Sequence, residues 1–271
     1  MRIALGIEYA GTKFTGWQSQ PDGRAVQDAV ERALGEIAGA RIATSAAGRT
    51  DAGVHATAQV VHFDSPVARP DTAWVRGVNS HLPPEIAVQW AVPVTPGFHA
   101  RFAATGRHYA YLLVNAPVRP AILAGRAGWY HRPLDVAAMR EGAAALAGTH
   151  DFSAFRAALC QAKSPVKTLG VAAVAAEGGC IRFDFSANGF LHHMIRNIVG
   201  ALIQVGSGNA PPSWIAELLA GRDRTRAAAT FAPDGLYLCG VDYAPGWGLP
   251  PTRRPVVLPR VAAAGAESAR D

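Results

Sequence analysis

Two hydrophobic periods alternate along this chain, and their alternation limits the folds that it can adopt. Ile3, Leu5, Ile7 and Tyr9 occupy every second position, which predicts a strand with one buried face. From Val26 to Ile37 the apolar residues recur at helical spacing, and Gly39 is expected to end that helix. Residues 57–64 again resemble a strand. The order strand, helix, strand predicts an α/β arrangement with helices packed on a sheet.

The same periods continue to about residue 241 and predict two similar α/β halves that share a sheet. A run of small residues at 103–106 is the expected boundary, which gives an N-terminal subdomain over 1–105 and a C-terminal subdomain over 106–246. Residues 247–271 mix Pro, Arg and Ala without periodicity and are expected to be a disordered tail. The remaining predicted strands are 86–94, 108–115, 169–176, 181–186 and 236–241, and the remaining predicted helices start at Asp135, Leu191 and Ser213.

Composition excludes several classes of protein. The sequence has no apolar run near 18 residues and no signal-like start, so a cytoplasmic protein is expected. Three cysteines without a Cys-x-x-Cys pair indicate reduced thiols rather than a zinc site. The formal net charge of +6 is compatible with a polyanionic partner. Only three of the 26 basic residues are lysines, and a coding bias toward arginine can produce that ratio, so the charge permits RNA binding without requiring it.

One short segment suggests catalysis. Residues 48–56 read Gly-Arg-Thr-Asp-Ala-Gly-Val-His-Ala, with Asp51 between small residues and Arg49 two positions before it. Glycines let the backbone turn tightly or approach a ligand, and a nearby arginine favours the ionised carboxylate. This is a suitable way to present a reactive carboxylate to a planar substrate. The alternative is an ordinary surface turn, which the composition of the segment alone favours.

This segment is similar to the catalytic motif of tRNA pseudouridine synthases of the TruA type, which modify the anticodon arm. Further segments of that family follow in the expected order over roughly residues 1–245, so chance agreement is a poor explanation. The opening loop has Ala10 where an acidic residue is expected. The matching segments are Glu8–Gly11, Phe14–Gln18, Asn79 with Leu82–Pro83, Phe98–Phe102, Arg107–Tyr111, Asp151–Arg156 and Phe190–Asn197.

The resemblance implies a pseudouridine synthase fold: an α+β protein with two similar subdomains, a mainly antiparallel sheet, flanking helices and a central RNA-binding cleft. It implies isomerisation of uridine to pseudouridine at tRNA positions 38, 39 and 40, without a cofactor or metal. It also implies a homodimer in which one tRNA contacts both subunits. The C–N glycosidic bond breaks and the same base rejoins through carbon, which requires a carboxylate and a base taken out of the stack.

The resemblance also assigns the site residues. It makes Asp51 the essential carboxylate, Arg196 its cationic partner and Tyr109 the ring that stacks on the target base. Tyr111 shares a strand face with Tyr109, and either tyrosine fits the platform by position; Tyr111 is better explained as a core residue. An alternative interpretation of Arg196 is a snorkelling arginine at the edge of the apolar stripe. An alternative interpretation of Trp17 is a side chain that packs under its own loop. The expected substrate-binding residues are Arg49, Tyr109, Phe14, Trp17, Gln18, Arg101 and Arg107.

Competing functions are left with less support. A sibling synthase acting on other RNA uridines uses the same residues. A non-catalytic tRNA-binding or folding module needs none of Asp51, Tyr109 and Arg196, and a hydrolase needs a second carboxylate motif that is not apparent. His192 and His193, expected on one helix about 100° apart, are predicted not to share a metal ion.

Overall fold

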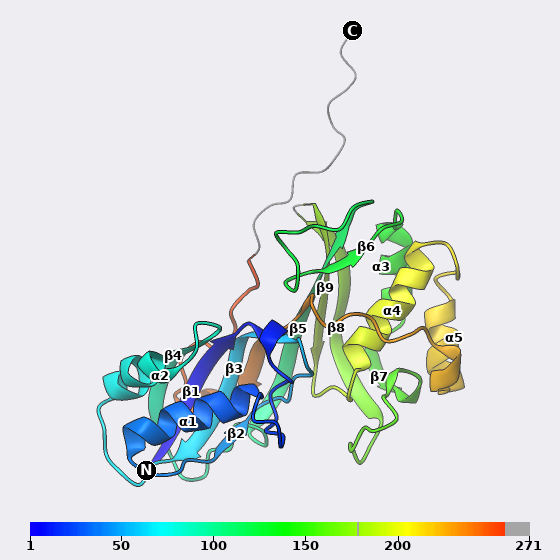
Figure 1. Cartoon of the computed structure of the whole chain (residues 1–271). Coiled ribbons are helices and arrows are strands. Elements are labelled where there is room, and N and C mark those ends of the chain that lie inside the picture. Colours follow the sequence, from blue (N-terminus) through cyan, green and yellow to red (C-terminus); the bar gives the residue numbers. More distant parts are fainter. Residues whose placement is uncertain (178, 258–271) are drawn as a thin grey trace. The chain divides into compact units, whose positions relative to one another are not determined.

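The computed structural model describes residues 1–177 and 179–257 (Figure 1). The chain divides into two compact units, the first formed by Met1–Tyr109 with Tyr237–Val256 and the second containing Ala110–Leu236. The chain therefore crosses between units at 109/110 and returns at 236/237, whereas the sequence pattern suggested a single crossing at 105/106. The return follows from β10 (Leu236–Tyr243), whose residues Tyr237 and Leu238 pair in parallel with His55 and Ala56 of β3.

In the first unit, the strands run in the order β4-β1-β3-β10-β5. β1 pairs in antiparallel fashion with β3 and with β4. α1 begins after the buried Ala25 and ends at Gly39, whose φ of 65° suits a glycine, as predicted. Its buried side chains Val26, Val30 and Leu34 form the apolar stripe read from the sequence. The elements of this unit are β1 (Arg2–Tyr9), α1 (Val26–Ala38), β2 (Thr44–Ala46), β3 (His55–Asp64), the π-helix Ala73–Gly77, α2 (Val78–His81), β4 (Ile86–Val94) and β5 (Ala104–Asn115).

The predicted break at 103–106 is wrong, because β5 begins at Ala104 and includes Thr105 and Gly106. A Cβ at Gly106 would collide with the Asp242 carboxylate of β10. The small residue serves close packing there and does not mark a linker.

In the second unit the order is β5-β9-β8-β7, with β6 alongside β5. β8 and β9, which correspond to the predicted strands 169–176 and 181–186, pair in antiparallel fashion. Asp135 accepts hydrogen bonds from the backbone N–H groups of Ala137 and Ala138, which confirms it as the cap of α3. That helix ends at Ala144, and Gly148 begins β7. The elements are β6 (Gly128–Tyr130), α3 (Val136–Ala144), β7 (Gly148–Asp151), β8 (Val166–Glu177), β9 (Cys180–Ala187), α4 (Met194–Gly206) and α5 (Trp214–Gly221).

The ten strands found among the described residues belong to one mixed, mainly antiparallel sheet, which confirms the α+β class that the resemblance implied. No helix within the described residues is long and apolar enough to span a membrane. No disulfide joins Cys160, Cys180 and Cys239.

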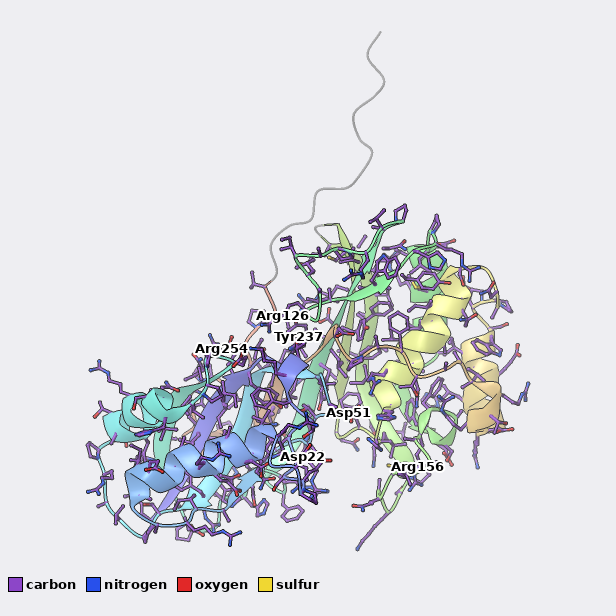
Figure 2. All side chains as sticks on the ribbon, viewed as in Figure 1. Asp22, Asp51, Arg126, Arg156, Tyr237 and Arg254 are labelled. Atoms are coloured by element: carbon purple, nitrogen blue, oxygen red, sulfur yellow. The ribbon has the colours of Figure 1, made fainter. Side chains whose placement is uncertain are left out.

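The disordered tail predicted for 247–271 is wrong for its first part. Arg253 forms an antiparallel bridge with Gly240, and the Arg254 N–H donates to the Cys239 carbonyl at 2.9 Å. Arg254, labelled in Figure 2, also forms an ion pair with Glu8 of β1 at 2.8 Å. The remainder of the predicted tail, residues 258–271, lies outside the described residues.

Candidate active site

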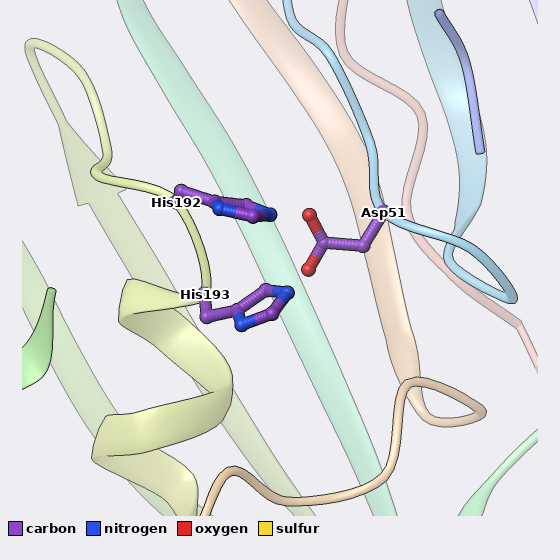
Figure 3. Close-up of side chains that lie close together, drawn as sticks. All are labelled: Asp51, His192 and His193. Carbon is purple, nitrogen blue, oxygen red and sulfur yellow. The ribbon is translucent and has the colours of Figure 1, made fainter. Parts of the chain in front are cut away.

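Asp51 lies on the loop that joins β2 to β3, which is the strand entry predicted from the sequence (Figure 3). The loop turns back at this residue, because the Val54 N–H donates to the Asp51 carbonyl at 3.1 Å and Gly53 adopts a φ of 79°. That φ favours glycine. The Asp51 side chain is half-buried. We refer to residues 48–54, which carry Asp51 as the candidate catalytic carboxylate, as the catalytic loop.

Buried hydrogen bonds attach the catalytic loop to the sheet beneath it. The Tyr9 hydroxyl of β1 lies 2.8 Å from Thr50 Oγ1, and the side-chain amide of Gln59 on β3 donates to the Gly48 carbonyl at 2.7 Å. Gln59 Oε1 accepts from the Gly48 N–H at 3.3 Å. Burial raises the pKa of Tyr9 to about 12, so its hydroxyl is protonated at neutral pH. The backbone on the N-terminal side of Asp51 is thereby fixed by side chains that do not reach solvent.

The opening loop, residues 10–18, interlocks with the catalytic loop. The Trp17 N–H donates to the Thr50 carbonyl at 3.0 Å, and the Gly11 N–H donates to His55 Nδ1 at 3.0 Å. A Cβ at Gly11 would collide with the Val54 carbonyl, so this glycine is required for the close approach. The opening loop and the catalytic loop, both of which carry motifs that resemble the family, therefore form one structural element.

Trp17 packs within this element. Its side chain is 2 % exposed and lies against Tyr9, with the ring centroids 5.9 Å apart. This burial favours the alternative interpretation of Trp17, packing under its own loop, over direct contact with RNA. Phe14 is half-buried, while Gln18 is exposed and donates from its amide to Gln27 at 3.0 Å.

The structure places Tyr109 beneath the catalytic loop. Its hydroxyl lies 3.5 Å from the position that a Cβ would take on Gly48, and the side chain is 8 % exposed. Burial raises the pKa of the Tyr109 phenol, and the nearby Tyr9 and Asp51 raise it further. Asp51 and Tyr109 are therefore brought together within the first unit. Tyr111, two residues later, is a core residue of the second unit whose hydroxyl donates to the Ala232 carbonyl at 2.9 Å.

Among the three arginines predicted to bind substrate, Arg49 and Arg101 are exposed. Arg107 differs, because its half-buried guanidinium donates to the backbone carbonyls of Ala47, Arg101 and Ala104 at 2.7–3.1 Å. Burial lowers the pKa of Arg107. These bonds give Arg107 a structural role, and its predicted contact with substrate stays a prediction.

In the second unit, Arg196 lies in the first turn of α4 and is half-buried. Its Nε donates to the Phe231 carbonyl at 2.8 Å, and the Phe231 N–H donates to the Arg196 carbonyl at 3.2 Å. The neighbouring Asn197 is fully buried; its amide donates to the Phe155 carbonyl at 2.7 Å and its Oδ1 accepts from Arg224 and Thr230. The Arg196 Nε, the Arg196 carbonyl and the Asn197 side chain are thus held by segments that are distant in the sequence.

The expected placement of His192 and His193, on one helix and about 100° apart, was wrong. Both residues precede the helix, His193 adopts a φ of 61°, and their ring centroids lie 3.9 Å apart rather than diverging (Figure 3). The positive φ turns the chain into α4 at a position where glycine or asparagine is usual.

Sequence reasoning did not single out Gln59 or Asn197 as parts of the site. A usable signal existed for each, since each is an amide side chain within an apolar stretch of a predicted strand or helix. Such residues are buried only with hydrogen-bond partners, so they indicate a specific internal contact.

Comparison with known proteins identifies the class of protein. The family model described as tRNA pseudouridine synthase matches residues 6–103 and 143–244. Curated proteins named tRNA pseudouridine synthase A match nearly the whole chain. That of Aromatoleum aromaticum is 60% identical over 96% of this chain and 99% of its own length. Those of Dechloromonas aromatica and Chromobacterium violaceum are 61% and 62% identical over 92% of this chain, and over 95% and 96% of their own lengths.

The chain therefore belongs to the tRNA pseudouridine synthase family, and it is an isomerase. Among solved structures, the crystal structure of a Cbf5-Nop10-Gar1 complex aligns with a TM-score of 0.36 and 12% identity, over 87% of this chain and 48% of that chain.

Proposed function

We propose that this enzyme converts uridine to pseudouridine in the tRNA anticodon stem-loop, at positions 38, 39 and 40, with Asp51 as the essential carboxylate. The observation that carries the proposal is the state of Asp51, which is half-buried in a turn that Tyr9 and Gln59 fix from below through their bonds to Thr50 and Gly48. Because the protein holds this carboxylate in place, the carboxylate is already oriented when the flexible RNA substrate binds and the reaction begins.

The reaction breaks the bond between N1 of the base and C1′ of the ribose and forms a bond between C5 and C1′. The proton on C5 is lost and N1 gains one, so no electrons are transferred to an external acceptor. Asp51 is the group proposed to promote bond breaking at the sugar or the base, and it is ionised in that role. As proposed, the reaction uses the protein's own groups and the substrate, with no cofactor or metal.

Other residues have supporting roles in this proposal. Tyr109 supplies the flat ring against which the target base rests, and Arg49 contacts a phosphate or occupies the space left by the flipped nucleotide. Phe14, Gln18 and Arg101 are proposed to contact RNA from the first unit. Arg196 of the second unit is proposed to pair with the Asp51 carboxylate in the complex with tRNA.

The test uses tRNA carrying 5-tritiated uridine, because loss of the C5 proton releases tritium. We expect release by the wild type and a reduction of at least about 1,000-fold in Asp51→Asn, which keeps the shape and removes the charge. Asp71→Asn, at an exposed aspartate of the same unit, is the matched control and should retain full activity. Release by Asp51→Asn at the wild-type rate would reject Asp51 as the catalytic carboxylate.

Three finer points need their own measurements. Mapping pseudouridine along the product tRNA tests the positions; modification confined to sites outside the anticodon arm would favour a sibling synthase.

Arg196→Lys should lower kcat while folding is retained, and an unchanged kcat would remove Arg196 from the site. We also propose a cytoplasmic homodimer, and a monomeric mass at micromolar concentration would contradict the dimer.

A further inference from the structure

Phe102 is a large aromatic residue that lies mainly in water. It is 76 % exposed, on the turn between β4 and β5 in the first unit. A single exposed apolar side chain is common on protein surfaces, so exposure by itself indicates nothing. The surroundings of this ring are more informative.

A rigid frame holds the ring in place. His99 Nδ1 lies 3.2 Å from the Arg101 N–H and 3.4 Å from the Phe102 N–H, and accepts from both. The Ala103 N–H donates to the His99 carbonyl at 2.9 Å. The His99 ring backs the Phe102 ring at a centroid distance of 4.3 Å. Burial lowers the pKa of His99, with the charge of Arg2 as the next cause, so the imidazole is neutral and able to accept at neutral pH.

The turn is attached to the segment that leads into the catalytic loop. The Arg107 guanidinium donates to the Arg101 carbonyl at 2.7 Å and to the Ala47 carbonyl at 3.1 Å. Ala47 lies four residues before Asp51. One half-buried side chain therefore connects the turn with Phe102 to the loop with the proposed catalytic carboxylate, and both belong to the same unit.

A cation completes the arrangement. The guanidinium carbon of the exposed Arg101 lies 5.7 Å from the centroid of the Phe102 ring. An exposed flat ring next to an arginine is the combination with which proteins bind unpaired nucleotides: the base stacks on the ring and the cation attracts the phosphate.

We propose that Phe102 is a stacking platform for an unpaired base of the tRNA substrate, and that Arg101 contacts the adjacent phosphate. This inference rests on the proposed function and adds a second, sequence-tolerant contact outside the position of the target uridine. His99 and Arg107 are positioning residues that fix the platform relative to Asp51.

The experiment compares Phe102→Leu, which keeps an apolar side chain without a ring, with Phe102→Trp, which keeps the ring. Tritium release from tRNA gives KM and kcat, and filter binding gives Kd at several salt concentrations. We expect Phe102→Leu to raise KM and Kd roughly 5- to 100-fold, with kcat nearly unchanged and the salt dependence of Kd unaltered. Phe102→Trp should remain within about threefold of the wild type, because every aromatic ring can stack on a base.

Arg101→Ala distinguishes the two contacts, because loss of a phosphate contact reduces the slope of log Kd against log salt by roughly one. Ile122→Ala, at another mainly exposed apolar side chain, is the matched control and should leave KM unchanged. Unchanged KM and Kd in Phe102→Leu would overturn the proposal. So would a shift from dimer to monomer in Phe102→Leu, since it would identify Phe102 as a contact between copies of the chain.

The two proposals fail in different ways. A wild type that isomerises no tRNA uridine would contradict the proposed function, whatever the Phe102 variants do. An active wild type with Phe102→Leu indistinguishable from it would contradict the stacking platform alone.

Discussion

Tyr109 and Tyr111 stand two positions apart on β5, yet they have different surroundings. Tyr111 donates its hydroxyl to the Ala232 carbonyl and packs edge-on against Phe183. Tyr109 lies beneath Gly48 with Asp51 near enough to raise the pKa of its phenol. Strand alternation places both tyrosines on one face and cannot separate them. Only the motif resemblance favoured Tyr109, and the structure places that tyrosine by the catalytic loop.

The proposed role of Tyr109 is its ring, which leads to a prediction. Because the pKa of its phenol is raised, the hydroxyl is protonated throughout the neutral range. Removal of this uncharged hydroxyl should have little effect on kcat/KM. We expect Tyr109→Phe to lower kcat/KM by less than about tenfold, and Tyr109→Leu by roughly 100-fold or more, because stacking is lost. Steady-state tritium release measures both.

The control is Tyr111→Phe, which removes a hydrogen bond in the core. It should cost about 1 kcal/mol of unfolding free energy with little change in kcat. If Tyr109→Phe were as inactive as Tyr109→Leu, the hydroxyl and not the ring would be the functional group.

The elements predicted well were those with several turns or a marked boundary. β4 was predicted with its observed bounds, since prolines flank and end it, and α1 was set by its apolar stripe and Gly39. β2, β6 and β7 were missed because three or four residues carry too little periodicity. α4 begins three residues later than expected, because the positive φ of His193 depends on tertiary contacts and not on local preference.

The catalytic loop illustrates the same limit at the level of one element. The sequence placed Asp51 before a strand, but the bonds that hold the loop connect residues far apart in the chain, such as Tyr9 with Thr50. Such pairings cannot be read from spacing. Gln59 on β3 is the central residue, since it binds Gly48 through both atoms of its amide.

We predict that Gln59→Leu destabilises the protein and slows catalysis together. The substitution keeps the volume but leaves the Gly48 N–H and carbonyl without their partner, at a cost of roughly 1–3 kcal/mol. Denaturant unfolding measures that loss, and kcat should fall by tenfold or more because the turn before Asp51 is no longer fixed. Gln89→Leu, at an exposed glutamine of β4, should change neither quantity. A Gln59→Leu variant with normal kcat at a temperature well below its melting point would separate the hydrogen bonds from catalysis.

At the scale of the whole molecule, the first unit is built from both ends of the described chain. β10 enters it beside β3, and residues 252–254 then attach to β10 and to β1. Reading the sequence in linear order suggested two consecutive halves and a loose tail. Periodicity identifies where strands occur but not which strands become neighbours, and a parallel pairing over nearly two hundred residues leaves no local signal.

The attachment centres on Asp242 of β10. Its carboxylate lies 2.6 Å from His108 Nε2 and 2.8 Å from both Arg253 Nε and Nη2. Burial alone would raise the pKa of Asp242, but the bonds from His108 and Arg253 outweigh it and hold that pKa below its usual value. A carboxylate with a lowered folded-state pKa stabilises the protein above its unfolded-state pKa, and this contribution disappears as the pH falls through the folded-state value.

We therefore predict that Asp242→Asn lowers the unfolding free energy by about 1 kcal/mol at pH 7, a modest value because Arg253 is largely exposed. The difference from the wild type should persist down to about pH 5 and shrink below about pH 4, where the wild-type carboxylate is itself protonated. Urea unfolding at pH 7, 5 and 3.5 measures it, with Asp71→Asn as the control for an exposed aspartate. A difference that stays constant from pH 7 to 3.5 would show that shape and not charge holds the segment. In either case, proteolysis near residues 252–254 should be faster in Asp242→Asn, because the release of Arg253 frees the backbone that bridges to Gly240.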